Sequence, residues 1–283
     1  MSFRHSGQRS ARQGLAGRDV AITGGARGIG LQTAKAFSER GARVLIGDID
    51  FDGAKAAVGE VPGVRAVRLD VRDGQAFERF VDEAGELDVL VNNAGIMPLG
   101  PFLDEQEGVT RRQIEVNLWG VMAGMRAALP GMVERGRGQI VNVASMGGRF
   151  PLPGAATYTA TKAAVIGLTE AVRHELRGSG VTLTTVLPAL VETELVAGVP
   201  EGRGLPAATP EQAATAIVRG VERRSATVYV PRRLRLAEAA LAVAPRALVD
   251  FTRRRLDDRR VLERLDSAAR RGYDERVAQA GRS

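Results

Sequence analysis

From residue 19 to about residue 230, short apolar runs alternate with longer segments in which apolar residues recur at helical spacing. The apolar runs do not alternate with polar residues, which is typical of strands buried on both faces of a sheet. Helical segments between such strands predict an α/β fold with a doubly wound, parallel, seven-stranded sheet. The predicted strands are residues 20–23, 43–47, 64–69, 87–91, 139–144, 181–187 and 227–230, and the first predicted helices are residues 29–39, 53–58 and 75–84.

The pattern changes after residue 231, where the chain becomes rich in arginine and keeps helical periodicity. Helices are predicted over residues 234–244, 245–256 and 259–269, and Pro245 is well placed to start the second of them. We therefore predict a flexible basic tail at residues 1–18, a single compact domain at residues 19–230 and a helical extension at residues 231–283.

The extension has two interpretations, because its helices combine an apolar stripe with a basic face. Such helices lie on an anionic membrane or pack against protein. Acidic residues interrupt the basic face, so packing against protein is favoured and peripheral membrane contact is the alternative. The apolar residues are Leu234, Leu241, Leu248, Phe251, Leu256, Leu262 and Leu265, and the acidic ones are Asp250, Asp257, Asp258, Glu263 and Asp266.

Composition excludes several classes of protein. Hydrophobic residues make up 44% of the 283 residues and charged residues 26%, which is typical of a globular chain. The chain has no cysteine and two histidines, so disulfides, thiolate sites and a histidine metal site are not expected. No apolar run is long enough to span a membrane, and the N-terminus lacks the apolar stretch of a secretory signal. Its arginines and serines resemble a transit peptide, but a solvated tail is favoured, and we expect a cytoplasmic protein.

The net charge of +7 is unevenly distributed. Residues 1–18 carry +4 and residues 231–283 carry +6, which leaves −3 on residues 19–230. A nucleic-acid enzyme would place its basic residues on the folded body, interleaved with aromatic residues, and aromatic residues are only 4% here. Nucleic acid is therefore not an expected partner.

A glycine-rich segment, TGGARGIG, follows the first predicted strand and opens the first helix. In that position it predicts a dinucleotide-binding loop, because glycines let the backbone approach a pyrophosphate and the helix N-terminus offers free N–H groups. The residues expected at the cofactor from this loop are Gly24, Arg27, Gly28, Ile29 and Gly30.

The acid at the end of the second strand bears on the choice of cofactor. Asp48 is placed to accept hydrogen bonds from the adenosine ribose and would repel a 2′-phosphate, which favours NAD. Arg27 would attract that phosphate, so NADP stays open. Asp50 is interpreted as a solvated acid in a turn.

Further motifs follow in a recognisable order: Asn92-Asn93-Ala94-Gly95 after the fourth strand, Asn117 in a long helix, Ser145 after the fifth strand, and Tyr158 with Lys162. With the glycine pattern, these motifs resemble the short-chain dehydrogenase/reductase family over residues 17–230. The resemblance implies a Rossmann fold and adds Asp70, Val71, Asn93, Ala94, Gly95, Pro188, Val191 and Thr193 to the cofactor site.

Two features depart from the family pattern. Pro188-Ala189 stands where the family usually has Pro-Gly, which affects the loop on the nicotinamide side. The C-terminal extension is longer than in the family's acyl-carrier-protein reductases, which argues against a role in fatty-acid synthesis.

Tyr158 and Lys162 are four residues apart, so they share one face of a helix. Chance would give such a pair only about 0.03 times in this chain. A neighbouring ammonium and an oxidised nicotinamide should lower the phenol pKa, which makes Tyr158 a general acid for a ketone or a general base for an alcohol. Ser145 can donate a hydrogen bond to the substrate oxygen. By resemblance, Lys162 also holds the nicotinamide ribose and Asn117 holds a water of a proton relay.

Other candidates have simpler interpretations. Asp70 is either an adenine contact or a helix N-cap, or both. Trp119 and Met122 are interpreted as packing residues and His174 as a surface or interface histidine, not a ligand. Residues 146–156 include Phe150, Leu152 and two prolines, which suggests an apolar wall and a hydrophobic substrate.

The leading hypothesis is an NAD(P)-dependent oxidoreductase that interconverts a secondary alcohol and a ketone. The alternative is a cofactor-binding regulator or membrane-surface protein that kept the fold and lost turnover. The resemblance also implies a homodimer or homotetramer formed through the helices that carry Asn117 and Tyr158.

Overall fold

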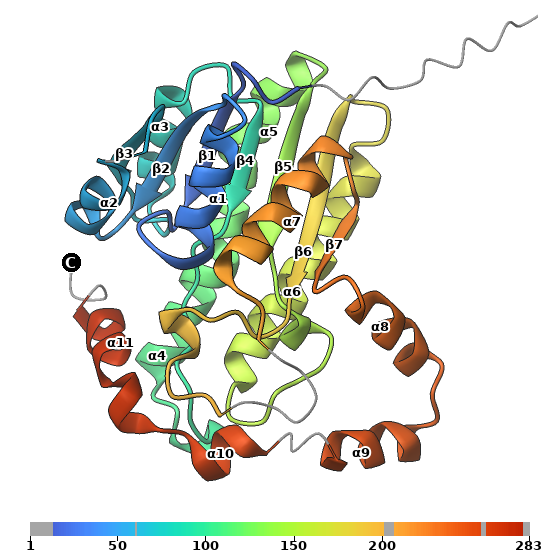
Figure 1. Cartoon of the computed structure of the whole chain (residues 1–283). Coiled ribbons are helices and arrows are strands. Elements are labelled where there is room, and N and C mark those ends of the chain that lie inside the picture. Colours follow the sequence, from blue (N-terminus) through green and yellow to red (C-terminus); the bar gives the residue numbers. More distant parts are fainter. Residues whose placement is uncertain (1–13, 60, 201–206, 256–258, 280–283) are drawn as a thin grey trace, which may run out of the picture.

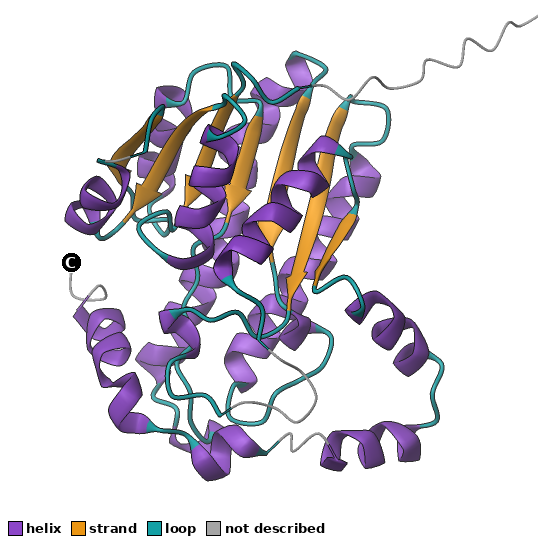
Figure 2. Cartoon of the chain, viewed as in Figure 1, coloured by secondary structure: helices purple, strands orange, loops and turns teal. Residues whose placement is uncertain are grey.

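The computed structural model describes residues 14–59, 61–200, 207–255 and 259–279. Its centre is a seven-stranded parallel sheet with strand order β3-β2-β1-β4-β5-β6-β7 (Figures 1 and 2). The strands are β1 (Asp19–Thr23), β2 (Arg43–Asp48), β3 (Val64–Arg68), β4 (Val89–Asn92), β5 (Gly138–Val143), β6 (Val181–Pro188) and β7 (Thr227–Val230). This confirms the predicted doubly wound sheet.

Helices cover both faces of the sheet. They are α1 (Gly28–Ser38), α2 (Phe51–Val58), α3 (Gly74–Glu83), α4 (Glu107–Ile114), α5 (Gly120–Glu134), α6 (Ala156–Glu175) and α7 (Pro210–Glu222). Helices α1, α2 and α7 pack on one face and α3, α5 and α6 on the other.

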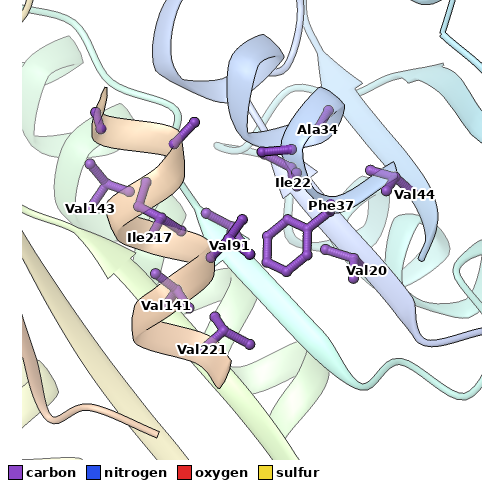
Figure 3. Close-up of a cluster of buried hydrophobic side chains, with 14 of the residues drawn as sticks. Val20, Ile22, Ala34, Phe37, Val44, Val91, Val141, Val143, Ile217 and Val221 are labelled. Atoms are coloured by element: carbon purple, nitrogen blue, oxygen red, sulfur yellow. The ribbon is translucent and has the colours of Figure 1, made fainter. Parts of the chain in front are cut away.

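The two cores explain why the central strands carry apolar residues on both faces. Val20 and Ile22 of β1 pack with Phe37 and Ile217 on the face that Figure 3 shows, whereas Ala21 points to the opposite core. Successive side chains of a strand point to opposite faces, so both sets of positions must be apolar in a sheet covered on both sides.

The strand order places β1 between β2 and β4, where the chain switches from one side of the sheet to the other. In open parallel sheets, ligands bind beyond the carboxyl ends of the strands at such a switch point. The loops that leave β1, β4, β5 and β6 therefore define the place to look for a site.

The extension forms α8 (Leu234–Ala242), α9 (Arg246–Arg255), α10 (Arg260–Arg264) and α11 (Ser267–Gln279). The predicted single helix over 259–269 was wrong. Leu265 has extended backbone, and the Asp266 carboxylate accepts hydrogen bonds from the N–H groups of Ala268 and Ala269, so a new helix begins there.

The extension returns to the loops below the sheet, where α11 lies near α4 (Figure 1). Asp266 N–H donates to Gly198 O at 2.9 Å, and Arg112 of α4 donates to Val277 O at 2.9 Å. Leu256, Asp257 and Asp258 lie outside the described residues.

Part of the predicted N-terminal tail belongs to the folded domain. Leu15 is buried in the core of β1 and α1, and Arg18 forms an ion pair with Asp88 at 2.8 Å. Residues 1–13 lie outside the described residues. Within the described ranges, no helix combines the length and the apolar character needed to cross a membrane.

Candidate active site

A cavity of about 1460 Å³ lies beyond the carboxyl ends of the strands. The loops after β1, β2, β4, β5 and β6 line it, together with α6 and parts of the extension. Of the predicted site residues, Gly30 and Asn117 do not reach the cavity. The predicted residues that line it are Gly24, Arg27, Gly28, Ile29, Asp48, Asp70, Val71, Asn93, Ala94, Gly95, Ser145, Tyr158, Lys162, Pro188, Val191 and Thr193.

The glycine-rich segment forms a turn that only glycine accommodates. Gly24 and Gly28 have φ of 67° and 54°, and a Cβ on Gly24 would lie 2.8 Å from Ala94 Cα. A Cβ on Gly30 would lie 2.1 Å from Gly24 O, so Gly30 serves the close packing of α1 against the turn. Asn93 closes the arrangement from β4, because its side-chain amide donates to Thr23 O and Gly24 O at 3.0 Å.

Asp48 is tied to the glycine turn. Its carboxylate accepts hydrogen bonds from the N–H groups of Ala26 and Asp50, each at 3.0 Å. Burial raises the pKa of Asp48, and these two hydrogen bonds counteract part of that increase. The Asp48 carboxylate thus lines the cavity at the end of β2 as a hydrogen-bond acceptor, and the two N–H groups fix its position.

Arg27 is occupied by two carboxylates, which sequence reasoning missed. It forms ion pairs with Asp50 and, at 3.1 Å, with Glu194 in the loop after β6. Asp50 was interpreted as a solvated acid, but it also caps α2 by accepting from Gly53 N–H. A phosphate that used Arg27 would have to compete with both acids.

Asp70 is not the N-cap of α3, because Asp73 performs that role. Arg72 donates two side-chain hydrogen bonds to the Asp70 carboxylate at 2.6 and 2.9 Å. Burial raises the pKa of Asp70, but the hydrogen bonds from Arg72 outweigh it and hold the pKa below its usual range. Asp70 and Val71 line the cavity beside the end of β3.

Tyr158 and Lys162 lie one turn apart on α6, and both are nearly fully buried. The Lys162 ammonium donates to Val143 O at 2.9 Å and lies 5.7 Å from the centroid of the Tyr158 ring. Burial lowers the pKa of Lys162 to about 8 and raises that of Tyr158, which hydrogen bonding with Ser145 partly offsets. The predicted lowering of the phenol pKa therefore stays a prediction for the complex with cofactor.

Ser145 stands beside this pair, directly after β5. Its side-chain oxygen accepts from Gly147 N–H at 2.9 Å and so caps the short helical turn Met146–Gly148. A hydroxyl that accepts in this way keeps its own proton for donation into the cavity. The capping and catalytic interpretations of Ser145 are thus compatible.

Asn117 lies in a single π-helical turn, Glu115–Trp119, between α4 and α5. Such turns often occur at functional sites. Its amide accepts from Ile96 N–H and donates to Ile96 O, both at 2.8 Å, and donates to Thr161 at 3.2 Å. The Asn117 side chain therefore clamps the loop after β4 to α6, behind Gly95 and Lys162.

The sequence matches the short chain dehydrogenase family over residues 18–204. The chain belongs to the short-chain dehydrogenase family. This confirms the resemblance seen in the motifs and the Rossmann-type fold.

Several relatives of this short-chain dehydrogenase have assigned activities. The 2,5-dichloro-2,5-cyclohexadiene-1,4-diol dehydrogenase LinX of Sphingobium indicum is 38% identical over 194 residues, 66% of this chain and 78% of that protein. The 3-alpha-(or 20-beta)-hydroxysteroid dehydrogenase of Mycobacterium tuberculosis is 40% identical over 192 residues, 66% of this chain and 74% of that protein.

Two solved structures resemble this short-chain dehydrogenase closely. A short chain dehydrogenase from Burkholderia cenocepacia in complex with NADP has a TM-score of 0.76 and 31% identity, covering 87% of this chain and 99% of that one. The 3-ketoacyl-(acyl-carrier-protein) reductase from Brucella melitensis, complexed with NADH, has a TM-score of 0.70 and 29% identity, covering 76% and 97%.

The extension contributes residues to the cavity that sequence reasoning missed. Tyr273 and Arg276 of α11 line it, as do Leu234, Ala237 and Ala240 of α8. No lysine stands four residues after Tyr273, so the spacing that singled out Tyr158 does not apply to it. The signal in the sequence that could have drawn attention to Tyr273 is the rarity of tyrosine, since the chain has only three.

The substrate side of the cavity is apolar. Met97, Ala155 and the Tyr158 ring form a buried cluster with partly buried apolar side chains around it. Those neighbours are Leu99, Leu152, Leu195, Val196 and Val199. Phe150 and Leu152 line the cavity, in keeping with the predicted apolar wall.

Trp119 and His174 lie outside the cavity, and both are exposed. Trp119 was interpreted as a packing residue, but it is 46% exposed and stacks with Arg126 at 5.3 Å. His174 is exposed on α6, as predicted, within 4.0 Å of Glu170.

Proposed function

We propose that this short-chain dehydrogenase is an NAD(P)-dependent oxidoreductase that interconverts a secondary alcohol and a ketone on an apolar small molecule. The observation that carries this proposal is the position of Ser145, Tyr158 and Lys162, which line one cavity together with a glycine turn that fits a pyrophosphate. A regulator without turnover would not need the three catalytic side chains.

The residues present fit a nicotinamide dinucleotide. Gly24 and Gly28 let the turn lie tightly against Ala94 and Thr193, and the start of α1 offers free N–H groups to a pyrophosphate. Asp48 would hold the adenosine ribose, Asp70 and Val71 the adenine, and Lys162 the nicotinamide ribose. The remaining walls of the dinucleotide site would be formed by Asn93, Ala94, Gly95, Pro188, Val191 and Thr193.

A bound nicotinamide supplies or accepts the hydride in this chemistry. In the reducing direction, Tyr158 donates its phenolic proton to the ketone oxygen while Ser145 donates a hydrogen bond to the same oxygen. The Lys162 ammonium stabilises the resulting phenolate, which then recovers a proton from solvent. In the oxidising direction the phenolate removes the alcohol proton.

NAD is the proposed cofactor. The Asp48 carboxylate would repel a 2′-phosphate, and Arg27 is already paired with Asp50 and Glu194. The neighbours in complex with NADP and with NADH show that related proteins use either, so the assay below includes both.

The substrate class rests on the apolar lining. A cavity bounded by Met97, Leu152 and Val199 favours a hydrophobic molecule with few polar groups. The relatives that act on a cyclohexadienediol and on a hydroxysteroid support cyclic secondary alcohols as the first compounds to test.

A homodimer or homotetramer is proposed from the helices that carry Asn117 and Tyr158. Ile114, Trp119 and Val133, on α4, the π-turn and α5, are 45%, 46% and 40% exposed. Apolar side chains in such numbers on neighbouring helices favour contact with a second copy.

The decisive experiment is a screen of cyclic secondary alcohols and ketones with NAD(H) and NADP(H), read by the absorbance of the reduced nicotinamide. The proposal expects turnover of at least one apolar compound and a higher kcat/KM with NAD(H). Cofactor binding without any turnover across the panel would favour the regulator instead.

A further inference from the structure

Helix α11 inserts a second tyrosine into the cavity. Tyr273 is 9% exposed and lines the same cavity as Tyr158, although 115 positions of sequence separate them. Only the extension brings it there, because α11 lies below the loops that leave the sheet (Figure 1).

Arg270, one turn earlier on α11, fixes the position of this tyrosine. Its guanidinium is 1% exposed and lies 4.5 Å from the centroid of the Tyr273 ring. It donates to Leu195 O at 3.1 Å, to Ala197 O at 3.2 Å and to Met97 O. The loop after β4 and the loop after β6 are thus joined to α11 through one buried side chain.

The Tyr273 hydroxyl has an unused proton. It accepts a hydrogen bond from Met97 N–H at 2.7 Å, and no acceptor for its own proton exists among the described residues. Burial raises the pKa of Tyr273 to about 12, so the phenol stays protonated and acts as a donor. A buried donor needs an acceptor, which water or a ligand in the cavity can supply here.

The surroundings restrict what that ligand can be. Met97, Leu195 and Val196 surround this part of the cavity, and their side chains offer no other donor to an oxygen. Within this apolar cluster, an oxygen that entered would lose its water and regain the hydrogen bond from Tyr273.

We propose that Tyr273 forms a second polar subsite, in which its hydroxyl donates a hydrogen bond to an oxygen of the substrate remote from the reacting carbon. This inference rests on the proposed function. It narrows the substrate class to apolar cyclic compounds that carry two oxygens, one at Tyr158 and one at Tyr273. Tyr273 is a positioning residue, since it binds the substrate away from the reaction centre.

The test compares Tyr273→Phe with the full-length wild type on matched ketones. Phenylcyclohexanone and its para- and meta-hydroxyphenyl counterparts share the reacting carbonyl and differ by one oxygen that the nicotinamide cannot oxidise or reduce. In the wild type, the hydroxylated ketone should have a higher kcat/KM than phenylcyclohexanone. In the Tyr273→Phe variant the ratio of these two kcat/KM values should fall by roughly 3- to 30-fold, mainly because KM for the hydroxylated ketone rises. Its kcat/KM for phenylcyclohexanone and its KM for the cofactor should stay within about twofold of wild type.

Tyr229→Phe is the matched control, because Tyr229 lies outside the cavity and donates to Glu238 at 2.6 Å. It should leave the preference for the hydroxylated ketone unchanged. A purely structural role of Tyr273 would lower kcat/KM equally for all three ketones, since Met97 N–H would lose its acceptor whatever the substrate.

Equal losses, or no advantage of either hydroxylated ketone in the wild type, would overturn the inference. Absence of turnover with every ketone in the wild type would instead overturn the proposed function.

Discussion

The Tyr158 phenol and the Lys162 ammonium share an environment that favours their neutral forms. Burial raises the first pKa and lowers the second to about 8, so the free protein keeps a protonated phenol beside an ammonium that is close to releasing its proton. This combination suits a proton donor at neutral pH. We propose that ionisation of the phenol would draw on the further positive charge of an oxidised nicotinamide.

Replacement of Tyr158 by phenylalanine should remove the proton donor and keep the ring. The ring packs with Met97 and Ala155, so the fold and the Kd for cofactor should change little. We expect kcat to fall by about 10²–10⁴-fold, as for other general acid–base residues. Steady-state kinetics with a cofactor titration measures both, and near-normal turnover would refute the role of Tyr158.

The Lys162→Met variant should be more stable than wild type near neutral pH, while it loses turnover. The pKa of Lys162 falls from 10.5 to about 8 in the folded protein, so the unfolded chain binds more protons between these values. The free energy of unfolding should therefore rise with pH from about 8 to 10 in wild type, through the contribution of Lys162. Removing the buried charge should add about 2 kcal/mol near pH 7, after allowance for the lost bond to Val143 O.

Chemical denaturation at about pH 7 and about pH 9.5 measures this difference. The stability difference between Lys162→Met and wild type should shrink at the higher pH. Lys55→Met on α2 is the matched control, because its side chain is exposed. If Lys162→Met destabilises the protein at both pH values, burial of the ammonium is not the dominant effect.

At the scale of elements, the strands could be predicted from the sequence to within one or two residues. Burial on both faces makes the successive positions Val89, Leu90 and Val91 of β4 apolar, and such a run has few other interpretations. The order of the catalytic motifs then located the cavity, because parallel strands bring their carboxyl ends to one edge.

Elements set by tertiary contacts could not be predicted in this way. The π-turn at Asn117 interrupts one continuous helical pattern, and the break at Asp266 depends on its hydrogen bond with Gly198, which is 68 positions away. The two partners of Arg27 come from two segments far apart in the sequence, the segment after β2 and the loop after β6. Local periodicity contains no information on contacts between residues that are far apart in the sequence. A single sequence also cannot show which distant positions vary together.

Helix α11 should depend on Arg270 for its attachment. Arg270→Met keeps the length of the side chain but leaves Met97 O, Leu195 O and Ala197 O without this donor. We expect a loss of about 2–4 kcal/mol, seen as faster amide exchange in α11 and as a lower Tm. Arg271→Met, an exposed neighbour on the same helix, should leave both unchanged. Equal behaviour of the two variants would mean that other contacts hold α11.

At the scale of the whole molecule, the extension has two unlike halves. Helices α10 and α11 pack across the cavity, where Val261 lies against Gly154 and Arg276 pairs with Glu194 at 2.6 Å. Helices α8 and α9 and the segment between them leave four apolar side chains exposed: Leu236, Val243, Leu248 and Phe251 are 75%, 85%, 52% and 52% exposed. Packing against protein therefore describes α10, α11 and the face of α8 that lines the cavity, and membrane contact remains the alternative for the exposed face of α8 and α9.

Deletion of residues 233–283 should separate these roles. It uncovers the apolar cluster of Met97, Leu195 and Val196, so the truncated protein should be less soluble or change its oligomeric state. The glycine turn and Asp48 lie outside the deleted segment, so NAD binding should persist, whereas the preference for the hydroxylated ketones should be lost with Tyr273. Size-exclusion chromatography, NAD titration and the ketone assay measure these effects. Two results together would assign the extension to membrane binding. The truncated protein would keep its oligomeric state and kinetics, and the full-length protein would sediment with anionic liposomes in a salt-sensitive way.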